Sequence, residues 1–175
     1  MRLVFVEGSK VAIVAQDKQM GDAKNFTISR QDKETLDQIG SHGNIYNESI
    51  VDQNMADPSF DFDGKKVFTI IDKNSGEYLG DIRLIKYSED EYEIGLVIIQ
   101  DKRNNGYGSD AIKAITSYAF NKMNAKKVFL RVYRNNPCAK KLYQRLGFVY
   151  EKSEDNGYVI DGVKYLEDYM AIKKN

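Results

Sequence analysis

The order of strand and helix patterns along the sequence predicts an α/β domain with a mixed sheet. Strand patterns dominate residues 67–99, and strand and helix patterns alternate over residues 100–175. The length agrees with this class, because 175 residues lie within the range of a single domain. Hydrophobic residues make up 42% of the chain, which is enough for a buried core. We therefore expect one domain that covers residues 1–175.

The first clear strands form a β-hairpin. Residues 67–71 are β-branched and aromatic, residues 72–76 (DKNSG) form a turn cluster, and residues 78–85 have the character of a second strand. Residues 92–99 follow as a third strand. This segment becomes apolar on both faces toward its end, so we expect a buried central strand there.

An amphipathic helix is predicted for residues 109–123. Apolar residues recur there at three- and four-residue spacing, which gives the helix one apolar face. A strand follows at residues 128–133. Asn136 before Pro137 then provides a helix N-cap with proline at the first helical position, and Gly147 ends that helix.

The segments on either side of this core are harder to assign. Residues 16–66 are polar, with weak helical patterns only at residues 35–39 and 47–55. Near the other end, Asp161-Gly162 is a tight-turn signal. The final strands are expected at residues 148–151 and 165–172.

The composition excludes several classes of protein. The formal net charge is 0, so the chain as a whole has no electrostatic affinity for nucleic acid or for an anionic membrane. No apolar stretch reaches the length of a membrane span, and the apolar run near the N-terminus is too short for a secretory signal. One cysteine, Cys138, leaves no internal disulfide and fits a reducing cytoplasm. One histidine, His42, in a loop-like segment, provides too little for a histidine-based zinc site or a Ser-His-Asp triad, and we expect no metal.

A loop between the third strand and the amphipathic helix is the main candidate site. Its sequence is QDKRNNGYGSDAI, residues 100–112. Backbone N–H groups at a helix start have no intrahelical partner, and the helix dipole favours an anion there. Gly106 and Gly108 lack a Cβ, so an anion can approach the backbone, and Lys102 and Arg103 add positive charge. The loop therefore predicts a site for a phosphate or pyrophosphate.

The glycine spacing admits more than one kind of phosphate loop. A P-loop NTPase needs Lys followed by Ser or Thr after the last glycine, and Ser109-Asp110 excludes that class. A Rossmann dinucleotide motif fits the spacing of Gly106, Gly108 and Ala111, but a polar connector separates these glycines from the preceding strand. A plain turn with a helix cap also explains two glycines. The residues alone leave these interpretations open.

Two segments together resemble the GCN5-related N-acetyltransferase (GNAT) family. Residues 103–108, RNNGYG, match its Q/R-x-x-G-x-G/A motif, and residues 136–148, NPCAKKLYQRLGF, are similar to its N-x-x-A-x-x-L-Y-x-x-x-G-F helix. The strand EYEIGLVI is also similar, and the closing DGVKYLEDYMAI resembles the branch that acetylates protein N-termini, such as those of ribosomal proteins. The resemblance covers residues 67–175, the expected cofactor-binding core, and leaves residues 1–66 poorly matched.

The resemblance implies a fold and a cosubstrate. The family's fold is a twisted, mixed and mostly antiparallel sheet with a splayed central strand and helices on both faces. Its cosubstrate is acetyl-CoA. The loop backbone would bind the pyrophosphate, and the splayed strand end would pair with the pantetheine amides as a peptide adds to a sheet edge. The implied cofactor-binding residues are Leu96, Val97, Ile98, Arg103, Asn104, Asn105, Gly106, Tyr107, Gly108, Ser109, Asn136 and Tyr143.

The resemblance also implies catalytic residues. Tyr143 matches the family's general acid, since a phenol with a pKa of about 10 can protonate a thiolate; the alternative is a half-buried tyrosine beside Leu142. Glu93 corresponds to the general base of histone-acetylating members of the family, although its spacing to the glycines is one residue shorter. The alternative is that Glu93 faces solvent and that a water molecule or another group is the base. Asn136 matches a cofactor-contacting asparagine and is equally a helix N-cap. Cys138 is expected to be a small buried residue rather than a nucleophile.

These observations predict an N-acetyltransferase that transfers an acetyl group from acetyl-CoA to a primary amine, on a small molecule or peptide, by direct attack. The alternative is a non-catalytic acyl-CoA-binding or sensing module on the same fold. We expect no nucleic-acid or membrane partner, and a homodimer stays open. An acidic stretch favours a cationic acceptor, because clustered carboxylates attract a cation. The alternative is that this stretch is a solvated loop with no role in binding. Its residues are Glu48, Asp52, Asp57, Asp61 and Asp63.

Overall fold

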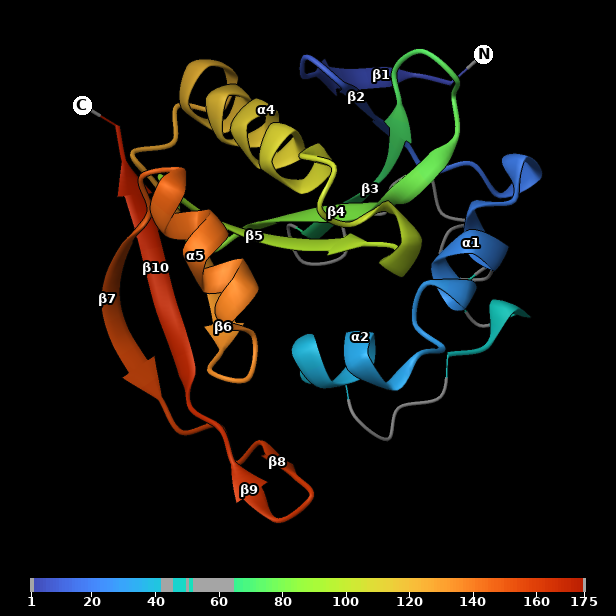
Figure 1. Ribbon diagram of the computed structural model, residues 1–175. Helices are drawn as coiled ribbons and strands as arrows, with labels where there is room; N and C mark the ends of the chain where they lie inside the picture. Colours follow the sequence, from blue (N-terminus) through green and yellow to red (C-terminus); the bar gives the residue numbers. More distant parts are fainter. Residues whose placement is uncertain (1, 42–45, 50, 52–64, 175) are drawn as a thin grey trace.

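The computed structural model describes residues 2–41, 46–49, 51 and 65–174. Its main feature is an eight-stranded sheet (Figure 1). The strands lie in the order β1 (Val4–Glu7), β2 (Val11–Ala15), β3 (Lys65–Asp72), β4 (Tyr78–Lys86), β5 (Glu91–Ile98), β6 (Lys127–Tyr133), β10 (Glu167–Lys173) and β7 (Val149–Glu154). Neighbours in this order are antiparallel, apart from β5 and β6, which are parallel. The predicted mixed and mostly antiparallel sheet is therefore confirmed.

Helices cover both faces of the sheet (Figure 1). On one face lie α4 (Tyr107–Lys122) and α5 (Pro137–Arg145), and on the other lie α1 (Asp22–Ile28) and α2 (Lys33–Gln38). Two 3-10 turns, η1 (Lys18–Met20) and η2 (Gln100–Lys102), precede α1 and the glycine loop. The predicted turn at Asp161-Gly162 joins a small separate hairpin of β8 (Val159–Ile160) and β9 (Val163–Lys164).

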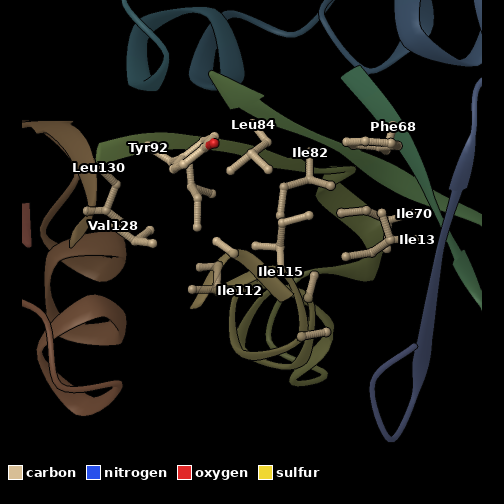
Figure 2. Close-up of a cluster of buried hydrophobic side chains, with 14 of the residues drawn as sticks. Ile13, Phe68, Ile70, Ile82, Leu84, Tyr92, Ile112, Ile115, Val128 and Leu130 are labelled. Atoms are coloured by element: carbon tan, nitrogen blue, oxygen red, sulfur yellow. The ribbon is translucent and has the colours of Figure 1, made fainter. Parts of the chain in front are cut away.

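The hydrophobic core lies between the sheet and α4. Figure 2 shows Ile112 and Ile115 of α4 pointing toward Ile82 and Leu84 of β4. These four side chains are at most 2% exposed. Full burial of one such side chain contributes about 1.5–3 kcal/mol. The apolar helical face that the sequence predicts thus holds α4, and with it the glycine loop, against the centre of the sheet.

The sheet opens into a fork where β5 parts from β6. β5 pairs with β4 as far as Ile98, but with β6 only as far as Ile94, which lies opposite Leu130. Within the described residues, the edge of β5 over residues 95–98 therefore has no strand partner on the β6 side. This is the splayed central strand that the family resemblance implies.

The N-terminal residues contribute strands that the sequence analysis does not predict. β1 and β2 extend the sheet beyond β3. β1 has only four residues, and β2 is a continuous apolar run of five, in which periodicity cannot distinguish a strand from a buried helical segment. α1 is also unpredicted. Its sequence is mostly polar, and the helix is fixed by tertiary bonds from the buried Asp22 to Arg2 and Thr69.

Two helices begin earlier than predicted because of their caps. α4 begins at Tyr107 rather than at residue 109, since Gly106, with a φ of 82°, is its N-cap. α2 begins at Lys33 rather than at residue 35, because the side chain of Asp32 accepts a hydrogen bond from the Thr35 N–H. A glycine in the left-handed region or a short carboxylate is a common way to start or flank a helix.

The last strands are also displaced from their predicted bounds. β7 begins at Val149 and extends to Glu154, and β10 begins at Glu167. Most of the helix predicted at residues 47–55 lies outside the described residues, as does His42. Of the acidic stretch, Glu48 is described and exposed. The other members lie outside the described residues: Asp52, Asp57, Asp61 and Asp63.

Candidate active site

The fork of the sheet opens into a cleft of about 1270 Å³. This volume exceeds the roughly 300–1,000 Å³ of most small-molecule pockets, so the cleft can hold a large ligand. It is lined by β4, β5 and β6 together with α2, the glycine loop, the start of α4, and α5. All of the predicted site residues line it, except Glu93 and Asn105.

The first turn of α4 presents its backbone donors to this cleft. Gly106 caps the helix without a side-chain hydrogen bond. The N–H groups that follow, including those of Gly108 and Ser109, have no intrahelical partner because they belong to the first turn. With the positive end of the helix dipole at the same place, this turn can bind an anion such as a pyrophosphate.

The loop before this turn is held in shape by its asparagines. Asn104 has a φ of 64°, a left-handed conformation that asparagine tolerates better than most residues. The side chain of Asn105 donates to the carbonyls of Lys102 and Arg103, at 3.2 and 3.0 Å. The Asn105 carbonyl accepts a bond of 2.9 Å from Lys10 Nζ. Asn105 therefore shapes the loop from behind rather than lining the cleft.

Gly108 lets the first turn of α4 pack closely against the end of β5. A Cβ at this position would lie 3.2 Å from Leu96, 3.5 Å from Ile98 and 3.9 Å from Leu142. Gly108 has no positive φ, so the requirement for glycine is one of space; the left-handed glycine is Gly106. The unpaired edge of β5 lies in the cleft lining beside these apolar side chains, so the residues present fit the pantetheine arm of coenzyme A.

Arg103 connects the loop to the opposite wall of the cleft. Its Nε donates to the Ile98 carbonyl at 3.0 Å, and its Nη2 donates to the Thr35 hydroxyl at 2.6 Å. It also forms an ion pair of 3.5 Å with Glu34. The guanidinium is therefore engaged by the protein, and Arg103 positions the strand end, the loop and α2 relative to one another.

Asp110 fixes the start of α4 from the other side. Its carboxylate accepts hydrogen bonds of 2.8–3.0 Å from the backbone N–H groups of Ser9, Lys10 and Val11. Burial acts to raise the pKa of Asp110, but these backbone donors outweigh it and lower that pKa. A Cβ on Gly8 would lie 2.2 Å from the carboxylate. The hairpin of β1 and β2 thus braces the loop, across a sequence separation that local patterns do not reveal.

Tyr143 lies on the wall of the cleft formed by α5. It is 8% exposed and packs against Phe148, with a ring-centroid distance of 6.3 Å. Burial raises the pKa of Tyr143 to about 12, although the positive charge of Arg83 acts in the opposite direction. The phenol is therefore protonated at neutral pH, as a proton donor must be.

Asn136 and Cys138 occupy the start of α5. The Asn136 side chain accepts a bond of 3.1 Å from the Ala139 N–H, so it is a helix N-cap, and it also lines the cleft. Cys138 is exposed and lines the cleft, so its assignment as a buried residue is wrong. The first turn of a helix on the surface leaves its side chain uncovered.

Glu93 is buried in an ion-pair cluster behind the cleft. It is 5% exposed, so it does not face solvent. Its Oε1 accepts bonds of 3.0 and 2.9 Å from the guanidinium of Arg131. Arg131 also pairs with Glu167 at 3.4 Å, and both of these residues line the cleft. Burial raises the pKa of Glu167, against the opposing effect of Arg131. Glu167 was not among the residues predicted for the site, because the strand pattern of residues 165–172 does not indicate which face of the sheet Glu167 occupies.

A second buried ion pair lies on the same wall. Arg30 bonds to both oxygens of Asp81 at 2.7 Å, and its guanidinium lies 3.5 Å from the centre of the Phe26 ring. This pair fixes the segment after α1 against β4. Arg83 follows Asp81 on the same face of β4 and also lines the cleft.

Additional positive charge surrounds the cleft, from residues that the sequence analysis did not assign. Lys113 of α4 and Lys141 and Arg145 of α5 are exposed and line it. Among the described residues, no group of three or more His, Cys, Asp or Glu side chains could hold a metal ion. No helix in the described part of the chain is long and apolar enough to cross a membrane.

A family model described as an acetyltransferase (GNAT) domain matches residues 16–149. The chain therefore belongs to the GNAT acetyltransferase family, which confirms the resemblance carried by its two motifs. The match begins inside the N-terminal part that the motifs leave unassigned. GNAT acetyltransferases use acetyl-CoA, and with this membership the dinucleotide interpretation of the glycine spacing no longer applies.

Individual relatives agree with this assignment. An uncharacterized N-acetyltransferase of Bacillus subtilis (strain 168), YnaD, is 30% identical over 86 residues, which cover 49% of this chain and 51% of the relative. The chain thus matches about half the length of that relative. Solved structures show the fold. A GNAT-family acetyltransferase from Bacillus anthracis has a TM-score of 0.78 at 22% identity, covering 96% of this chain and 97% of that one.

A second solved structure is the spermidine N-acetyltransferase of Vibrio cholerae in complex with CoA and spermine. Its TM-score is 0.78 at 20% identity, covering 94% of this chain and 96% of that one. The resemblance of the closing segment to the branch that acts on protein N-termini stays a prediction.

Proposed function

We propose that this chain is an acetyl-CoA-dependent N-acetyltransferase that transfers an acetyl group to a primary amine by direct attack. The observation that carries the proposal is the forked sheet, which has anion-binding backbone donors on one wall of its cleft and the protonated Tyr143 on another. Tyr143 and the first turn of α4 line the same cleft, so a single extended molecule can contact both.

When bound, acetyl-CoA supplies an acetyl thioester. The N–H groups from Gly106 to Ser109 would hold its pyrophosphate, with Lys113 and Lys141 nearby. The unpaired edge of β5, with the apolar side chains beside Gly108, would hold the pantetheine arm. These contacts would orient the thioester at the fork, and orientation is a large part of catalysis in group transfer.

The reaction itself requires a neutral amine and a proton for the departing sulfur. The amine nitrogen forms a bond to the acetyl carbon as the carbon–sulfur bond breaks, and Tyr143 delivers its hydroxyl proton to the thiolate. For removal of the amine proton, Glu93 is the candidate from the sequence, but its carboxylate is held by Arg131 outside the cleft lining. Glu167 lines the cleft and has a raised pKa, so we propose it as the second candidate base, acting directly or through water.

The decisive experiment is thiol release from acetyl-CoA in the presence of a panel of amines. An acetyltransferase releases coenzyme A only when an acceptor is present, and the acetylated amine accumulates in equal amount. The alternative, a non-catalytic acyl-CoA-binding module, predicts that acetyl-CoA binds and raises the melting temperature while no amine stimulates thiol release.

A cationic acceptor stays a hypothesis within this proposal. It has support from the acidic stretch and from the spermidine N-acetyltransferase among the structural neighbours. The described cleft adds no free carboxylate to it, because Glu34, Asp81 and Glu167 each have a basic partner. The electrostatic case for a cation therefore depends on residues outside the described part of the chain.

A further inference from the structure

Arg83 lines the cleft, and its guanidinium has no hydrogen-bond or ion-pair partner within the described residues. Its Nε is buried, and within the described residues it makes no hydrogen bond. The two other arginines on this face of the sheet differ, because Arg30 is bound to Asp81 at 2.7 Å and Arg131 to Glu93 at 2.9 Å. A buried donor without an acceptor costs free energy, so Arg83 is suited to an acceptor that a ligand brings into the cleft.

The position of Arg83 directs this donor into the fork. In the β4–β5 ladder Arg83 lies directly opposite Gly95. A Cβ on Gly95 would lie 2.1 Å from Arg83 Nε and 2.6 Å from Cζ, so the arginine crosses β5 over the glycine. Gly95 is the first residue beyond Ile94, where the pairing of β5 with β6 ends. The guanidinium thus reaches the point at which the sheet opens.

The proton donor of the proposed reaction lies within electrostatic range of Arg83. The charge of Arg83 acts on the pKa of Tyr143, although the two residues come from β4 and α5. Both residues line the cleft. Asp81 on the same strand is held by Arg30, and Glu93 and Glu167 are held by Arg131, so these carboxylates do not neutralise Arg83 by contact.

The pyrophosphate already has donors in the first turn of α4, so an anion at Arg83 would come from the other substrate. We propose that Arg83 binds a carboxylate of the acceptor, and that the acceptor is an amine that also bears a carboxylate, as in an amino acid. The planar guanidinium presents paired donors that match the two oxygens of a carboxylate. This inference rests on the proposed acetyltransferase function and names the substrate class of that site.

The test compares amines that differ only in the anion. Glycine and glycinamide form one pair, β-alanine and β-alaninamide a second, and phosphoethanolamine and ethanolamine test whether a phosphate serves in place of the carboxylate. Thiol release is measured for the wild type, Arg83→Met, Arg83→Lys and the control Lys86→Met, which changes an exposed lysine on the same strand. The ratio between variant and wild type for each amine cancels the different basicities of the amines.

Arg83→Met should lower kcat/KM for the carboxylate-bearing amine by about 10- to 100-fold, the range for hydrogen bonds to charged groups. The loss for the corresponding amide should be clearly smaller, because it reports only the effect of the Arg83 charge on Tyr143, and KM for acetyl-CoA should not change. Arg83→Lys keeps the charge but not the paired donors, so its loss should be intermediate. Lys86→Met should behave as the wild type. Because Arg83 Nε has no internal partner, Arg83→Met should not lower the melting temperature.

Equal losses for an acid and its amide would overturn the inference, because Arg83 would then act on acetyl-CoA or on the reaction itself. A preference for diamines that Arg83→Met leaves intact would also overturn it, in favour of a cationic acceptor. A binding measurement separates this inference from the proposed function. With coenzyme A bound, β-alanine should raise the melting temperature more than β-alaninamide does, and only when Arg83 is present. If this shift is seen and no amine releases thiol, the anion site stands and the acetyltransferase proposal fails.

Discussion

Replacing Tyr143 with phenylalanine separates the chemical role of this residue from its packing. The ring and its contact with Phe148 remain, and only the hydroxyl is lost. Within the described residues that hydroxyl makes no hydrogen bond, so its removal leaves no partner unsatisfied. We therefore expect Tyr143→Phe to fold like the wild type at neutral pH, and any loss of turnover to report on the proton donor.

The magnitude follows from the pKa of this residue. Burial raises the pKa of Tyr143 from 10.0 to about 12, with Arg83 opposing. A raised pKa means that the unfolded tyrosine ionises first as the pH increases. The stabilising contribution of the buried neutral phenol is thus complete below pH 10 and is lost as the pH rises through about 12. At about 1.4 kcal/mol for each pKa unit, the wild type should lose about 3 kcal/mol relative to Tyr143→Phe across this window.

Two assays test this reasoning. Urea unfolding at a series of pH values should show the difference in unfolding free energy between the two proteins growing in favour of the variant at alkaline pH. Thiol release at neutral pH should show a kcat that is about 10²- to 10⁴-fold lower, the usual contribution of a general acid, with KM for acetyl-CoA unchanged. The control is Tyr118→Phe, which should keep wild-type turnover, because Tyr118 is half-buried, packs against Phe5 with tilted rings and does not line the cleft.

Wild-type turnover in Tyr143→Phe would leave Tyr143 with a packing role only. If the difference in unfolding free energy between the wild type and Tyr143→Phe does not change with pH, the buried hydroxyl of Tyr143 ionises as it does in the unfolded chain. The second result would refute the argument from burial even if turnover fell.

Three further predictions concern other parts of the cleft. Gly108→Val should abolish coenzyme A binding in calorimetry while the fold is retained, because its Cβ would lie 3.2 Å from Leu96 and its side chain would stand beside the first-turn N–H groups proposed to bind the pyrophosphate. Unchanged affinity would remove this turn from the site. Glu167→Gln should lower kcat and remove the acidic limb of the pH profile of kcat, because the variant has no carboxylate to accept the amine proton. Glu93→Gln should chiefly lower the melting temperature, because it weakens the ion pair with Arg131. The reverse pattern would make Glu93 the base. If the acceptor is cationic, its KM should rise with ionic strength, while KM for acetyl-CoA should rise less. The double change Asp61→Asn and Asp63→Asn should weaken this salt dependence. If the best acceptor is neutral or anionic, or if its KM changes with neither salt nor the double substitution, the acidic stretch is a solvated surface.

The parts of the site that could be predicted from the sequence are those encoded locally. Gly106 and Gly108 need specific neighbours within a few residues, and Asn136 with Pro137 forms a cap whose parts are adjacent in the chain. The apolar face of α4 is likewise a short-range pattern. For these elements the structure differs from the prediction only in boundaries, which depend on cap geometry.

The parts that could not be predicted depend on contacts between distant residues. Asp110 meets a hairpin about a hundred residues away, and Arg103 reaches Thr35 across the cleft. Glu93 was assigned to the correct strand, but its environment is set by Arg131, which comes from a neighbouring strand. Residues two apart in a strand lie on the same face, so Glu93 shares a face of β5 with Gly95. The sequence alone does not show that β5 parts from β6 at Gly95, because this depends on the register between the two strands. The position of Glu93 relative to the fork could therefore not be predicted.

Net charge illustrates a second limit of whole-chain reasoning. A formal charge of 0 removes the case for a partner that would cover much of the surface, such as a nucleic acid. It carries no information about a single cleft, since eight Lys or Arg residues but only three Asp or Glu residues line this one. Those three carboxylates are already paired with basic side chains, and Lys102 pairs with Glu77 outside the lining. Within the described residues, the basic lining residues without a partner are therefore Arg83, Lys113, Lys141 and Arg145. Part of this positive charge lies on α4 and α5, where the phosphates of coenzyme A would enter, and part of it is Arg83 at the fork. The proposed carboxylate site at Arg83 would accept a negatively charged group of the acceptor, so the charge of the acceptor is the property to measure first.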